Sequence, residues 1–322
     1  MQFTALTCPQ CGAPLPRQAA WRLLPCPHCG ANVTRSKSVV EAAEFRAAHA
    51  RVWGRAFAAD DASGRLLHCG ERRFRLLAPL GCGENAAVYL AERISPLPER
   101  VTLKLAHAAT PGGVLATEAS KLNTLQQSRA TGAAYFTRRL PQSLGTTQCG
   151  DREVLLLRHP GGYWGSLADV LRHAPRGIDP RHGVWLWRRI LEVLAFVHDS
   201  GWSHGDLAPE HLLVHPRDHG VLIIGWGKAR ASAAPAAIAR DLMQSAWSMR
   251  ALLCGGDEVP NFSSAIPVPL ANLLRRCSED ADWCAGTGAR GVDQQLAGAA
   301  REAFGPPRFI PFNPTAPWRH KS

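Results

Sequence analysis

Residues 202–227 read WSHGDLAPEHLLVHPRDHGVLIIGWG, and this stretch decides how the rest of the chain is interpreted. The triplet HGD at 204–206 belongs to a loop, and the apolar run LLVH after it predicts a strand. The turn-forming residues PRD at 216–218 separate this strand from a second one, VLII. The second strand ends at the triplet GWG, residues 225–227. The pattern is therefore a loop, two strands around a turn, and a glycine-flanked turn.

The stretch resembles the catalytic segment of protein kinases, in which the motif H-R-D-x-x-x-x-N comes before a pair of strands and D-F-G follows it. Asp206 matches the catalytic base of that family. His211 stands where the resemblance places an Asn, and Gly225 stands where it places an Asp, so both Mg²⁺ ligands are replaced. Imidazole is a poor ligand for Mg²⁺, which prefers oxygen. The resemblance implies a kinase scaffold with a reduced metal site, and Glu210 or Asp206 itself could compensate.

Upstream, residues 73–91 read RFRLLAPLGCGENAAVYLA and predict a strand, a glycine-rich turn and a second strand. The turn resembles the kinase loop G-x-G-x-x-G-x-V, because Gly81 and Gly83 match its first two glycines. Ala86 stands at the third glycine, and Val88 matches the residue that covers adenine. Alone, a G-x-G turn is often only a hairpin turn. In this resemblance it implies backbone N–H groups that approach phosphates.

A lysine and a glutamate downstream extend the resemblance. Residues 101–106, VTLKLA, alternate like a strand and resemble the kinase V-A-I-K strand, with Lys104 as the lysine that pairs with the phosphates. Glu118 lies on a predicted helix and matches the glutamate that pairs with this lysine. A purely structural salt bridge, or a solvated Glu118, is the alternative. Residues 159–162, HPGG, are placed like the kinase hinge, where backbone groups near Leu157 would hold adenine.

The second half of the chain predicts a helical lobe. Apolar residues recur at helical spacing over residues 180–199, and further helices are expected at about 268–279 and 292–304. The segment that begins at Asp241 resembles the central helix of the kinase C-lobe, and this resemblance implies that Asp241 accepts hydrogen bonds from the backbone of the 204–206 loop. The segment after Gly227 is short and lacks A-P-E, which argues against a peptide-docking platform.

Near the N-terminus, the motif C-P-x-C-G occurs twice and resembles the turns of a zinc ribbon. Its cysteines are Cys8, Cys11, Cys26 and Cys29. Four thiolates on two tight turns can close a tetrahedral, structural Zn²⁺ site with no open position for water. His28, between two of these cysteines, is expected to be a bystander. We expect the ribbon to contact a protein partner, and nucleic acid is the alternative partner.

Composition limits the setting of the protein. The chain has 322 residues, of which 46% are hydrophobic, and a net charge of +11. No apolar run is long enough to cross a bilayer, and no secretory signal is visible, so no membrane partner and a cytoplasmic location are expected. Of the ten cysteines, four form the C-x-x-C pairs, which favours metal binding over disulfides. The basic charge is either a solvated surface or one that binds acidic partners.

The sequence thus predicts an α+β chain with a two-lobed protein-kinase-like fold. The expected parts are a zinc ribbon (1–35), a helical connector (36–70) with a helix from Ser38 to about Ala59, an N-lobe (71–157), a helical C-lobe (158–305) and a Pro-rich tail (306–322). We expect a pseudokinase that acts as a nucleotide-sensing regulator or scaffold, with structural Zn²⁺ and with ATP but without firmly held Mg²⁺ or Mn²⁺. Its partner would bind through the ribbon or the tail. The alternatives are an active atypical Ser/Thr kinase and a nucleic-acid-binding adaptor.

Overall fold

The computed structural model describes residues 64–255 and 265–315, and short pieces before residue 41 that include His28. The chain divides into two units. The sheet unit comprises His49–Gly162 and Ile224–Arg230, and the helical unit comprises Met1–Ala48, Tyr163–Ile223 and Ala231–Ser322. The GWG triplet therefore belongs to the sheet unit, within the segment Ile224–Arg230, although the chain on both sides of this segment belongs to the helical unit.

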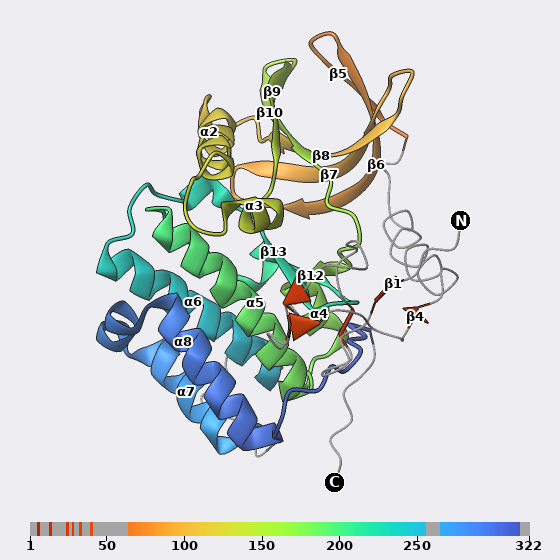
Figure 1. Cartoon of the computed structure of the whole chain (residues 1–322). Coiled ribbons are helices and arrows are strands. Elements are labelled where there is room, and N and C mark those ends of the chain that lie inside the picture. Colours follow the sequence, from red (N-terminus) through yellow and green to blue (C-terminus); the bar gives the residue numbers. More distant parts are fainter. Residues whose placement is uncertain are drawn as a thin grey trace. The chain divides into compact units, whose positions relative to one another are not determined.

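A six-stranded antiparallel sheet forms the sheet unit, in the order β5-β6-β7-β8-β10-β9. The strands are β5 (Leu66–Cys69), β6 (Arg72–Cys82), β7 (Ala86–Arg93), β8 (Glu99–Ala106), β9 (Ser143–Cys149) and β10 (Arg152–Arg158). Alternation along β8 places Val101, Leu103 and Leu105 in one buried apolar cluster. The sheet curls strongly (Figure 1), and the Thr147 hydroxyl of β9 donates to the Cys69 carbonyl of β5 at 3.4 Å.

Helix α2 (Val114–Gln126) packs on β9 and β10, and its leucines Leu115, Leu122 and Leu125 are buried. Its start is held by Glu153, whose carboxylate accepts hydrogen bonds from the backbone N–H groups of Leu115 and Ala116 at 3.0 and 2.8 Å. A carboxylate at a helix N-terminus satisfies free N–H groups and favours the helix dipole. The short helices α3 (Ala133–Phe136) and η1 (Thr137–Arg139) follow α2.

The described residues of the helical unit include five α-helices, a three-stranded sheet and two pairs of short strands. The helices are α4 (Leu167–His173), α5 (Pro180–Asp199), α6 (Pro235–Cys254), α7 (Val268–Glu279) and α8 (Ala281–Phe304). The sheet has the order β11 (Gly165–Ser166), β12 (Leu212–His215) and β13 (Gly220–Ile223), with η2 (Pro209–His211) before β12. Helices α5 to α8 pack against one another (Figure 1).

The predicted bounds of α5 and α7 are confirmed, but those of two other helices are wrong. Helix α6 begins at Pro235, before Asp241, and α8 begins at Ala281 and not at residue 292. Both early turns are rich in alanine or glycine, so no apolar stripe marks them in the sequence. Gly288 interrupts α8 with a φ of 66°, a conformation that glycine adopts without strain.

The expected helix from Ser38 is wrong at its start, because Val39–Val40 forms strand β4 and pairs with β1 (Ala5–Leu6). The rest of that helix lies outside the described residues, as do the four zinc-ribbon cysteines. Strand β2 (Leu24–Pro25) pairs with β3 (Asn32–Val33). The main sheet begins at Leu66, so the boundary expected at residue 71 is late.

The described part of the Pro-rich tail lies on the helical unit. Phe312 is buried and stacks on His219, and Phe309 meets His219 and His28 edge-on. Phe309 and Phe312 thus attach this part of the tail, up to residue 315, to the helical unit. In the described ranges, no helix is both long and apolar enough to cross a membrane.

Candidate functional site

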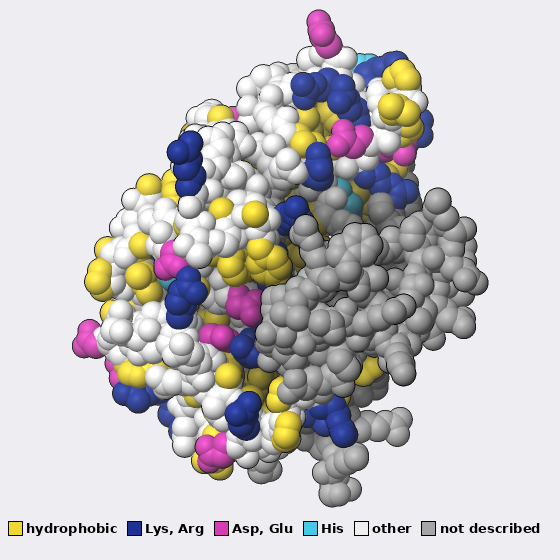
Figure 2. Space-filling view, viewed as in Figure 1, with side chains coloured by type: hydrophobic (Ala, Val, Ile, Leu, Met, Phe, Trp, Pro, Cys, Tyr) yellow, Lys and Arg dark blue, Asp and Glu magenta, His cyan; other side chains and the backbone are white. Residues whose placement is uncertain are grey.

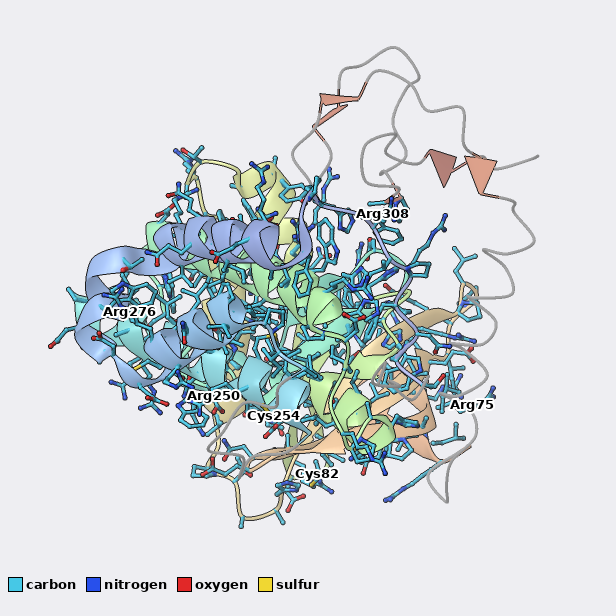
Figure 3. All side chains as sticks on the ribbon, turned by 90° about the horizontal axis from the view of Figure 1, so that it is seen from below. Arg75, Cys82, Arg250, Cys254, Arg276 and Arg308 are labelled. Atoms are coloured by element: carbon cyan, nitrogen blue, oxygen red, sulfur yellow. The ribbon has the colours of Figure 1, made fainter. Side chains whose placement is uncertain are left out.

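The glycine-rich turn joins β6 to β7. The Gly83 N–H donates to the Ala86 carbonyl at 2.9 Å and closes the turn. Cys82, at the exposed tip (Figure 3), lies 3.7 Å from His107 through Sγ and Nε2, and the same Nε2 donates to the Gly83 carbonyl at 2.9 Å. The expected strand–turn–strand is confirmed here.

Strand register brings three of the predicted nucleotide-binding residues into one row. Gly81 of β6 is opposite Val88 of β7, and Val88 is opposite Lys104 of β8. Leu157, near the end of β10, is opposite Thr102 of β8. Three segments that are separate in sequence therefore place the glycine, the apolar residue and the lysine side by side across the sheet.

Lys104 and Glu118 form a close ion pair. The Lys104 Nζ donates to Glu118 Oε2 at 2.5 Å, and the side chains are only 17% and 5% exposed. The alternative of a solvated Glu118 is therefore wrong. Because a buried carboxylate is expensive without a partner, this pair fixes helix α2 on β8.

A second lysine of α2 reaches the glycine-flanked turn. The Lys121 Nζ donates to the Gly227 carbonyl at 2.6 Å, and η3 (Trp226–Lys228) packs on α2. Trp226 is fully buried and anchors the turn. Gly225, before it, has a φ of 81°. The position that the resemblance assigns to a metal-binding Asp thus has a left-handed backbone and no side chain.

In the helical unit, the HGD loop is held by one buried carboxylate. Asp241 of α6 accepts hydrogen bonds from the N–H groups of His204 and Gly205 at 2.8 and 2.7 Å. Its side chain is fully buried and also lies 3.0 Å from His198 Nε2. The expected structural role of Asp241 is confirmed.

Other residues of α6 also hold this loop, and they were not predicted from the sequence; one is Arg240, whose Nε donates to the Gly205 carbonyl at 3.3 Å. Gln244 accepts from the Leu207 N–H at 3.1 Å and donates to the Gly205 carbonyl at 3.2 Å. The Ser248 hydroxyl donates to the Leu207 carbonyl at 2.7 Å. Together with Asp241, Gln244 and Ser248 recur at intervals of three and four, so they share one helix face. That spacing of polar residues along the helix was the signal in the sequence.

Asp206 and His211 are linked through the backbone. The Nδ1 of His211 donates to the Asp206 carbonyl at 2.7 Å, while it lies 3.7 Å from the Asp206 carboxylate. Both side chains are about one quarter exposed, at 26% for His211 and 25% for Asp206. His211 therefore braces the loop at the position where the resemblance places a metal-binding Asn.

The zinc site expected from the N-terminal cysteines is not part of the described structure. Cys8, Cys11, Cys26 and Cys29 lie outside the described residues. Within the described part of the chain, no group of three or more His, Cys, Asp or Glu side chains could hold a metal ion. His28, expected to be a bystander, is buried against Trp185, and its carbonyl accepts from the Arg188 guanidinium at 3.3 Å.

The chain is similar to known proteins in both sequence and structure. The Serine/threonine-protein kinase pkn2 of Myxococcus xanthus is 29% identical over 160 residues, which cover 49% of this chain and 18% of that protein. The chain thus matches less than a fifth of that relative's length. No family model matches the chain.

The crystal structure of the BubR1 kinase domain matches with a TM-score of 0.56, over 81% of this chain and 94% of that chain. Sequence identity in this match is 12%, so the likeness shows the fold alone. Fold and sequence similarity agree with the geometry of the described sheet and helices.

Proposed function

We propose that this protein-kinase-like chain is a pseudokinase, a nucleotide-sensing regulator or scaffold that does not transfer phosphate. One contrast carries the proposal. The Lys104–Glu118 pair is fully formed at 2.5 Å, whereas Gly225 and His211 occupy both positions of the expected metal ligands.

Phosphoryl transfer depends mainly on positioning and on neutralising the charge of the transferred group. In kinases, metal ions supply much of that neutralisation. Gly225 offers no side-chain ligand, and the Nδ1 of His211 is already bound to the Asp206 carbonyl. The groups that remain favour binding a nucleotide over splitting it.

An active atypical kinase is the second candidate, because the HGD loop is well braced and the Asp206 carboxylate stays partly exposed. Incubation of the full chain with γ-labelled ATP, Mg²⁺ and Mn²⁺, and a generic protein substrate separates the two candidates. We expect no label transfer above that of Asp206→Asn. Transfer that disappears in Asp206→Asn would establish the active kinase.

The four N-terminal cysteines are proposed to bind structural Zn²⁺ and to present the N-terminal segment to a protein partner. Strands β2 and β3 flank the second C-P-x-C-G motif, and His28 within it packs on α5. We expect one zinc per chain, lost in Cys26→Ser, by metal analysis of the purified protein. Salt-sensitive nucleic-acid binding that is lost with the zinc would favour an adaptor instead.

A further inference from the structure

We propose that Lys121 and Lys228, with Arg230, bind the phosphates of a nucleoside triphosphate in place of a divalent metal ion. This inference rests on the proposed nucleotide-binding function and names the groups that replace the metal. All of these residues belong to the sheet unit, as do Lys104 and the glycine-rich turn.

Lysine is rare in this chain, and its placement is uneven. The sequence has five lysines, of which Lys37 and Lys321 lie outside the described residues. The other three, Lys104, Lys121 and Lys228, lie around α2, η3 and the glycine-rich turn. In a chain that otherwise uses arginine, this gathering indicates a demand for compact ammonium groups, which act as point charges on phosphate.

The contacts connect the three lysines to one another through shared neighbours. Lys121 bonds to the Gly227 carbonyl at 2.6 Å, and a Cβ on Gly227 would lie 3.9 Å from the Glu118 carboxylate that holds Lys104. Lys228 lies 3.9 Å from Glu84 at the tip of the glycine-rich turn. The lysines thus span the space from α2 to the loop that would cover phosphates.

The local charge has the sign and size of one metal ion. Four cations, Lys104, Lys121, Lys228 and Arg230, lie near two carboxylates, Glu84 and Glu118, which leaves two positive charges. A divalent cation supplies the same excess in a kinase that holds one. Side-chain cations can therefore neutralise a triphosphate where Gly225 removes the metal ligand.

Lys121 is well suited to accept an anion. Partial burial lowers the pKa of Lys121, the Glu118 carboxylate opposes this shift, and Arg230 adds to it. An ammonium has three donors, and the bond to Gly227 uses one of them. Lys228 is exposed, and its loose pair with Glu84 is of a kind worth about 1 kcal/mol or less, so phosphate can displace it.

Two consequences distinguish this site from a metal-dependent one. Affinity should rise with the number of phosphates in the absence of divalent ions. Adding Mg²⁺ should weaken binding, because the Mg²⁺ complex of ATP carries two fewer negative charges and the lysines repel the metal.

Isothermal titration of the full chain with ATP, ADP and AMP tests the inference. The buffer is freed of divalent ions before the protein is added, so that no chelator strips zinc from the protein. We expect Lys121→Met and Lys228→Met each to weaken ATP binding about five-fold, and AMP binding by less than about two-fold. Excess Mg²⁺ should weaken ATP binding to the unmodified protein.

Arg75→Met is the matched control, because Arg75 is an exposed cation on β6, away from Cys82 and the glycine-rich turn (Figure 3). It should bind all three nucleotides like the unmodified protein. The inference is overturned if ATP binding requires Mg²⁺, or if both lysine variants bind ATP as tightly as the unmodified protein. Either result would still support a nucleotide-binding site. Equal losses for ATP and AMP also overturn the inference. No nucleotide binding in any buffer overturns the proposed function as well.

Discussion

Glu118 shows how burial decides the role of a single residue. In the sequence it is one glutamate on an ordinary helix, and a solvated position is a reasonable alternative. In the structure it is 5% exposed and held by Lys104. The pair could be predicted only from the kinase resemblance, because no local pattern joins residues that are 14 positions apart and on different elements.

Lys104→Met should destabilise the protein by about 3 kcal/mol, because it leaves the Glu118 carboxylate buried without a partner. The double variant Lys104→Met/Glu118→Leu should regain most of that loss, since both charges are replaced by apolar groups. Urea denaturation followed by tryptophan fluorescence measures both. Equal stability of the single and double variants would contradict a buried, mutually dependent pair.

At the scale of elements, the HGD loop owes its shape to α6. Asp241, Gln244 and Ser248 together satisfy backbone groups of residues 204–207. The predicted role of Asp241 is confirmed because it followed from the family resemblance. The other two were missed because the family resemblance assigned a role only to Asp241, although they follow it at intervals of three and four on the same expected helix.

Asp241→Ala should cost about 3 kcal/mol, because two buried backbone N–H groups lose their acceptor. Amide hydrogen exchange at His204 and Gly205 should accelerate more than exchange in α7. The control is Asp282→Ala on α8, which removes the carboxylate of an exposed residue. Unchanged exchange at the loop in Asp241→Ala would show that Asp241 does not hold it.

Basic side chains also gather in the sheet unit away from the candidate site. Figure 2 shows Lys and Arg side chains over the strands of the six-stranded sheet, where β6 supplies Arg72, Arg73 and Arg75. Glu92 pairs with Arg75 at 3.6 Å, and both side chains are partly exposed. Exposed ion pairs of this kind contribute little to stability. The charge of this part of the surface is therefore consistent with a basic surface that is simply solvated.

At the scale of the whole molecule, a pair of histidines joins separate parts of the helical unit. His182 of α5 lies 2.9 Å from His219 through Nδ1 and Nε2, and Phe312 of the tail packs on both. Burial lowers the pKa of His182 to about 4, which Asp179 opposes and Arg181 reinforces. Burial also lowers the pKa of His219, with His182, His28 and Arg189 adding to the shift and Asp218 opposing it.

These shifts predict a loss of stability in mild acid. In the unfolded chain these histidines become protonated near pH 6.5, whereas in the folded protein they stay neutral down to a lower pH. The stability they contribute is therefore fully present above pH 6.5, and it falls as the pH drops toward about 4. From pH 7 to pH 5, His182 alone should remove about 2 kcal/mol. Thermal unfolding across this range measures the effect.

The double variant His182→Gln/His219→Asn should flatten this pH dependence, and Asn tolerates the positive φ of 53° at His219. Some slope should remain, because burial and Arg100 lower the pKa of His159 in the sheet unit to about 4. An equally steep pH dependence in the double variant would exclude the histidine pair as its cause.

Much of the molecule could be predicted from sequence because its motifs and periodicities agree. The strands around Gly81 and Lys104, helix α5 and the paired strands after Asp206 carry strong patterns. The gathering of Lys121 and Lys228 could not be predicted, since it exists only once α2 and η3 pack together. The contacts of His28 and Phe312 depend likewise on packing between distant segments.

Thermal-shift titration with ATP, with and without Mg²⁺ or Mn²⁺, tests the central claim most directly. The unmodified protein and Lys104→Met are compared, each against its own unfolding temperature without nucleotide. We expect ATP to raise the unfolding temperature without metal, and Lys104→Met to abolish the rise. A rise that appears only with metal would contradict the proposed pseudokinase and indicate an assembled metal site. No rise under any condition would contradict nucleotide binding altogether.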